Sequence, residues 1–166
     1  MTILHFQLIP RRNRAKGLVP RIQRCSKQFR EAVATGDANK QSAVSKDAWD
    51  AMTKLFEILR GEQDDGHLAS SWMNVNTALI TELNSVADQQ KMLALRKIDR
   101  AQSQPLSLRH TLNKIAHYKT ATFRLDRRNA HYLLLGGVYK NKHWVAEILV
   151  SKLCKNAAMA IQAIST

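Results

Sequence analysis

Three side chains suited to phosphodiester chemistry recur every four residues in the segment LRHTLNKIAHY. Arg109, Asn113 and His117 occupy positions i, i+4 and i+8, so a helix places them on one face. Arginine binds phosphate oxygens through paired N–H groups, and imidazole transfers protons at neutral pH. Asparagine can orient either partner. The row fits metal-independent RNA cleavage, and it also fits an ordinary solvated helix face.

Other basic residues extend this candidate surface. His110 and Lys114 share the same helix, and Arg124, Arg127 and Arg128 follow it closely. We interpret these five as nucleic-acid contacts, the three arginines as phosphate ligands rather than base readers. A second basic face is expected on an N-terminal helix, where these residues recur at helical spacing: Arg21, Arg24, Lys27 and Arg30.

The net charge supports a polyanionic partner. The 166 residues carry 26 Lys and Arg against 13 Asp and Glu. The excess is concentrated at the two ends, with nine basic and two acidic residues in 1–40 and eleven basic and two acidic in 100–166. Such a one-sided field attracts phosphate polymers by releasing their counterions. An acidic protein partner and a merely basic protein without a partner are the alternatives.

Helical periodicity dominates the elements that must position these residues. Pro20 suits a first helical turn, and Gly36 suits a helix end. Ser45 is expected to cap a second helix that stops at Gly61. Pro105 precedes the helix of the Arg109 row, with Ser107 or Ser103 as its cap. The expected helices cover residues 20–36, 46–61, 68–98 with a break near 88–90, 108–119 and 151–164.

A β-hairpin is expected between the last two helices. Val138 and Tyr139 face Trp144 and Val145 across a short polar turn, which is typical of paired strands. The predicted fold class is therefore mainly α, an antiparallel helical bundle with a small β-hairpin before the C-terminal helix. We interpret residues 1–40 as a basic N-terminal arm and helix, whose residues 2–9 form a short strand or arm. Residues 41–166 form the bundle, with the hairpin near 131–150.

The segment LRHTLNKIAHY resembles the signature helix of the HEPN superfamily, and the likeness extends loosely over residues 45–164. Arg109 resembles the motif arginine, His110 the polar residue after it, and His117 the motif histidine. Asn113 resembles the asparagine in the LNKIxH version of this helix. The resemblance implies a four- or five-helix bundle, a homodimer, and metal-independent ribonuclease activity in a bacterial toxin or anti-phage system. Many members bind RNA or nucleotides without cleaving them.

Two hypotheses follow. The first is a HEPN-like nucleic-acid-binding protein that cleaves RNA without a metal or cofactor and has an antitoxin as partner. The second is a non-catalytic basic subunit of a nucleoprotein or defence complex, binding nucleic acid or an acidic protein. In both, the absence of a long apolar run or signal sequence predicts a cytoplasmic protein without a membrane span. Cys25 and Cys154 are expected to be reduced thiols.

Overall fold

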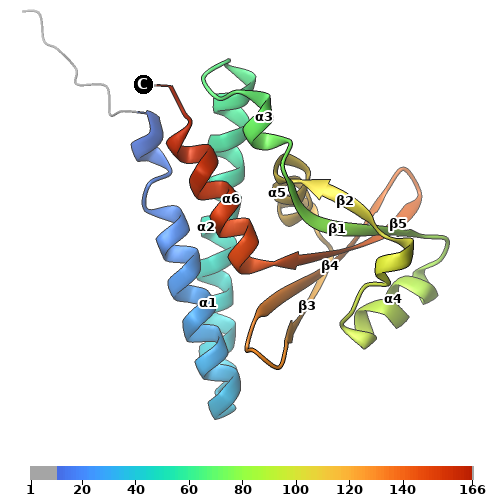
Figure 1. Cartoon of the computed structure of the whole chain (residues 1–166). Helices are drawn as coiled ribbons and strands as arrows, with labels where there is room; N and C mark the ends of the chain where they lie inside the picture. Colours follow the sequence, from blue (N-terminus) through green and yellow to red (C-terminus); the bar gives the residue numbers. More distant parts are fainter. Residues whose placement is uncertain (1–10, 166) are drawn as a thin grey trace, which may run out of the picture.

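The computed structural model describes residues 11–165, and the predicted strand or arm at residues 2–9 lies outside them. The described chain combines helices with one antiparallel sheet of strand order β2-β1-β5-β4-β3 (Figure 1). The strands are β1 (Asn76–Leu83), β2 (Gln104–Ser107), β3 (Thr120–Leu125), β4 (His131–Tyr139) and β5 (Lys142–Leu149). The α-helices are α1 (Leu18–Thr35), α2 (Ala38–Asp64), α3 (Ser70–Met73), α4 (Val86–Leu95), α5 (Leu108–His117) and α6 (Val150–Gln162), with 3-10 turns at Arg11–Arg14 and Arg100–Gln102.

The predicted mainly α bundle with one small hairpin is wrong, because the hairpin is the centre of a five-stranded sheet. The expected helix over 68–98 contains β1. Its apolar residues Val75, Leu79 and Leu83 are four apart, and this spacing fits a helix and also the two-residue period of a strand. The outer strands β2 and β3 carry many polar residues, because an edge strand is only partly covered. They therefore lack the apolar run that identifies a central strand.

Helices α4 and α5 pack on opposite faces of the sheet. Gln89 of α4 donates hydrogen bonds to the backbone oxygens of Gly137 and Trp144 at 2.8 and 2.9 Å. On the α5 side, the ammonium of Lys114 lies 4.6 Å from the Trp144 ring centroid. A Cβ at Gly137 would overlap the Trp144 indole. Glycine is therefore required here for close packing.

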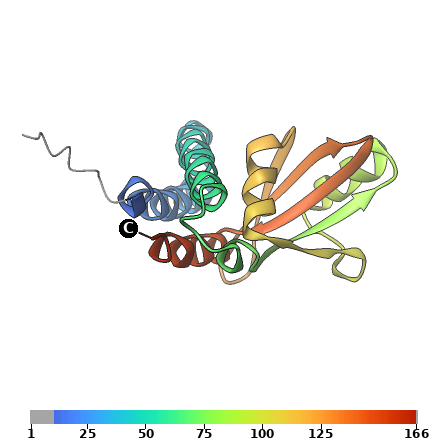
Figure 2. The ribbon, with the colours of Figure 1, turned by 90° about the horizontal axis from the view of Figure 1, so that it is seen from above.

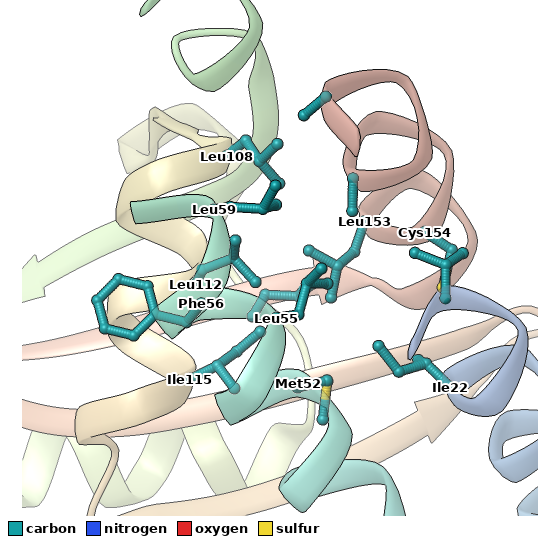
Figure 3. Close-up of a cluster of buried hydrophobic side chains, with 14 of the residues drawn as sticks. Ile22, Met52, Leu55, Phe56, Leu59, Leu108, Leu112, Ile115, Leu153 and Cys154 are labelled. Carbon is teal, nitrogen blue, oxygen red and sulfur yellow. The ribbon is translucent and has the colours of Figure 1, made fainter. Parts of the chain in front are cut away.

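The largest apolar core lies between α1, α2, α5, α6 and the inner sheet face (Figure 3). Leu55 of α2, Leu112 of α5 and Leu153 of α6 are fully buried and meet there. Ile22 brings α1 into the same cluster. Figure 2 shows α1, α2 and α5 side by side, with the sheet extending from α5. The motif helix α5 is therefore held between α2 and the sheet.

Helix ends show which local signals the chain obeys. Helix α1 ends at Gly36 in the left-handed conformation, φ +70°, as predicted. Ser107 caps α5 by accepting the His110 N–H. Helix α2, however, begins after Asp37, which accepts the Lys40 N–H, and runs through Gly61. The predicted bounds at Ser45 and Gly61 are wrong: the Asp37 cap starts the helix earlier, and beyond Gly61, whose place inside a helix costs ~1 kcal/mol, Gln63 and Asp64 accept hydrogen bonds from Arg109.

Candidate nucleic-acid interface

Arg109 begins the predicted row on α5, and its guanidinium is tied to the end of α2. Its Nη1 donates to Gln63 Oε1 at 2.8 Å and to Asp64 Oδ1 at 2.7 Å. The Arg109 hydrogen bond holds the pKa of Asp64 below its usual value. This ion pair partly neutralises the positive charge of Arg109, the residue that would bind phosphate according to the HEPN resemblance.

The other two members of the row lie on the solvent side of α5. Leu108, Leu112 and Ile115 are buried, which leaves Asn113 half-buried and His117 exposed. The His117 ring lies nearly perpendicular to the Phe56 ring, with ring centroids 6.4 Å apart. The three side chains thus share a helical ridge, as the spacing predicted.

His110 and Lys114 differ in their surroundings on α5. His110 is exposed, whereas Lys114 lies over the rings of Trp144 and Tyr139, at 4.6 and 5.6 Å from their centroids. Burial lowers the pKa of Lys114 below its ordinary value. Trp144 itself is only 3% exposed. Lys114 therefore joins α5 to the β4–β5 hairpin through cation–π contacts.

Two predicted nucleic-acid ligands, Arg124 and Arg21, already have carboxylate partners. Arg124 donates to the buried Glu147 carboxylate at 2.9 Å and stacks over Tyr132 at 4.2 Å. This hydrogen bond raises the pKa of Arg124. Arg21 is bound by two aspartates of α2, Asp47 and Asp50, which likewise raise its pKa. Both arginines join elements of the fold, and their charges are compensated locally.

Of the remaining predicted cations, Arg30 of α1 contacts the β3–β4 turn, which carries Arg127 and Arg128. Arg30 Nη1 donates to the Asn129 backbone oxygen at 3.3 Å, and its Nε donates to the Ser26 backbone oxygen at 3.3 Å. Both acceptors are neutral, so the positive charge of Arg30 is retained. We define the basic patch by the cations of α1 and the turn: Arg24, Lys27, Arg30, Arg127 and Arg128. Within residues 11–165, none of the five forms an ion pair.

The turn that carries Arg127 and Arg128 has a defined conformation. Asp126 Oδ1 accepts the backbone N–H groups of Arg128 and Ala130 at 2.9 and 2.8 Å. Asn129 adopts a left-handed conformation, φ +60°, which asparagine tolerates better than most residues. The two arginines are therefore displayed on a hydrogen-bonded turn, next to α1.

A cavity of about 360 Å³ beside this junction was not predicted. It lies between α1, α2, β3 and β4, and Phe29, Trp49, Phe123 and His131 supply aromatic walls. These rings are far apart in the sequence, so no local pattern marks them. The sequence gives only an indirect signal for this cavity. His131 and Leu133 belong to a strand, but they can be placed against Phe123 only once β3 is known to pair with that strand.

Both cysteines are buried free thiols, as predicted. Burial raises the pKa of Cys25 and of Cys154 to about 11, so neither is a reactive thiolate at neutral pH. In the part of the chain that the structure describes, no three His, Cys, Asp or Glu side chains are grouped to hold a metal ion.

Comparison with known proteins gives no relative: no family model, curated protein or solved structure matches the chain. None of the helices within residues 11–165 is long and apolar enough to span a membrane.

Proposed function

We propose that the protein binds RNA through the basic patch. The observation that carries this proposal is the Arg30–Asn129 contact, which joins two basic segments 99 residues apart into one surface. Five cations without carboxylate partners among the described residues can each approach a phosphate. Their affinity for a strand then comes largely from counterion release, with little dependence on sequence.

We propose binding without cleavage. Metal-independent RNA cleavage is the second candidate, and the exposed imidazole of His117 favours it. The arginine that would hold the phosphate, however, is engaged by Asp64 at 2.7 Å. A phosphate would have to compete with that carboxylate, which opposes the accurate placement that catalysis requires. The α5 ridge is in this proposal a minor contact surface.

The cellular setting follows from the same proposal. A non-catalytic basic protein fits a subunit of a nucleoprotein or defence complex in the cytoplasm. Two copies would double the number of basic patches and so raise affinity for a long strand through avidity. An acidic protein partner, an antitoxin included, would compete with RNA for the patch.

The proposal is tested by charge reversal on the β3–β4 turn. The double variant Arg127→Glu/Arg128→Glu is compared with Lys91→Glu/Lys140→Glu, which makes the same charge change on α4 and at the opposite end of β4. Fluorescence anisotropy measures the Kd for a labelled single-stranded RNA. We expect at least a tenfold loss for the turn variant and a much smaller loss for the control. Equal losses would show that net charge alone, and no particular surface, governs binding.

A further inference from the structure

We propose that the aromatic cavity between α1, α2 and β3–β4 receives one unpaired base of the bound RNA, so that the protein prefers single strands to duplexes. This inference rests on the proposed function. It adds a recognition element to the basic patch, because a base can enter a cavity only when it is free of its pairing partner.

The walls of the cavity present flat rings suited to a base. The Phe29 and His131 rings are stacked, with centroids 5.0 Å apart and an interplanar angle of 4°. Phe123 meets Phe29 edge to face at 4.8 Å. Trp49 lines the cavity from α2. Stacking on such rings tolerates any base, since all bases have a π-face.

His131 supplies a polar group that lacks a partner. Its Nδ1 lies 2.9 Å from Ser26 Oγ, whereas its buried Nε2 has no hydrogen-bond partner among the described residues. A buried polar atom without a partner is unusual in a native protein. Burial, with a smaller effect of the Arg30 charge, lowers the pKa of His131 to about 4. The ring is thus neutral at physiological pH, and its Nε2 can form one hydrogen bond with the edge of a base.

The cavity adjoins the basic patch through Ser26 and Arg30. Ser26 lines the cavity, and its backbone oxygen accepts the Arg30 Nε hydrogen bond. Arg30 also reaches Asn129, two residues before His131 in the chain. The exposed residues Ser42 and Ala121 form part of the lining, so the cavity reaches solvent. A strand whose phosphates contact Arg30 therefore has its bases within reach of the cavity.

The experiment fills the cavity without changing its charge. Ser42→Trp places an indole in the lining, and Ala43→Trp is the matched control, because Ala43 is the exposed neighbour outside the lining. Affinity is measured for a single-stranded RNA and for a blunt duplex of the same sequence, with 2-aminopurine fluorescence reporting base burial. We expect wild type and Ala43→Trp to prefer the single strand about tenfold. Ser42→Trp should lose that preference and the 2-aminopurine signal.

Each other result has a distinct meaning. If wild type binds neither RNA, the proposed function fails, and this inference with it. If wild type binds both RNAs equally, or if Ser42→Trp keeps the single-strand preference, only the base-binding cavity is overturned. His131→Phe gives a second readout, since it retains a ring against Phe29 but removes the unpartnered nitrogen. We expect it to reduce single-strand affinity severalfold and to leave duplex affinity unchanged.

Discussion

Arg30 on α1 and Asn129 in the β3–β4 turn are joined by a hydrogen bond of 3.3 Å from guanidinium to backbone oxygen. Because the acceptor is a neutral carbonyl, the contact fixes the position of the charge without cancelling it. Arg124, by contrast, forms an ion pair with the buried Glu147 at 2.9 Å. Arg124 therefore holds the fold together, whereas Arg30 remains available to bind a phosphate.

Replacing Arg124 should destabilise the fold rather than impair RNA binding alone. Glu147 is buried, and its Oε2 also accepts the Ile98 N–H at 3.1 Å. Arg124→Met leaves this carboxylate without its cation, so the free energy of unfolding should fall by about 3 kcal/mol. Chemical denaturation provides the measurement. Arg128→Met, on the exposed turn, should stay within about 0.5 kcal/mol of wild type; similar losses in both would refute the distinction.

Gly137→Ala should be among the most damaging single-methyl additions in the chain. The new Cβ would overlap the Trp144 indole, which is held between Gly137 and the Lys114 ammonium. Overpacking of this kind costs about 1–3 kcal/mol, which is measurable as a lower midpoint of denaturation. Gly17→Ala meets no atom within 4 Å and serves as the control. A Gly137→Ala protein as stable as wild type would mean that the indole can move aside.

His131 should make stability depend on pH between about 6.5 and 4. Its pKa is about 4 in the folded protein, against an ordinary 6.5. Between these values the unfolded chain binds a proton that the folded chain does not. The free energy of unfolding therefore falls as the pH is lowered through this window.

The His131→Phe variant isolates this effect, because every other titrating group is common to both proteins. Unfolding measured at pH 7, 5.5 and 4.5 should show a shallower loss for His131→Phe than for wild type. Parallel losses would mean that the imidazole titrates normally and is not desolvated.

His117 should be dispensable for the proposed activity. Incubation of the protein with RNA in EDTA should leave the RNA intact, and His117→Ala should change the Kd less than twofold. Cleavage by wild type that His117→Ala abolishes would instead support the ribonuclease hypothesis.

The sequence predicted those elements whose signals are local. Gly36 ends α1, Ser107 caps α5, and the segment around Trp144 forms a hairpin, because each depends on neighbours within a few residues. The Arg109 row was likewise predicted to share a helix face. Strand β1 was missed, since apolar residues at four-residue spacing fit both periods.

The candidate site was less accessible to sequence reasoning, because it depends on long-range contacts. All nine predicted nucleic-acid ligands are basic residues or histidine, and nothing in the sequence distinguishes Arg124, paired with Glu147, from Arg128. Arg21 pairs with Asp47 and Asp50, which lie more than twenty residues further along the chain. The cavity joins Phe29 to His131 across a hundred residues, through a sheet that was itself only partly predicted.

The salt dependence of RNA binding reports how many phosphates the basic patch contacts. Log K for a single-stranded RNA, plotted against log salt concentration, is compared for wild type and for Lys27→Ala/Arg127→Ala/Arg128→Ala. Each lost phosphate contact should reduce the steepness of the slope by about 0.7, so we expect a decrease of about 2. A triple variant whose slope and affinity equal those of wild type would contradict the account, because the basic patch would then make no contact with the strand.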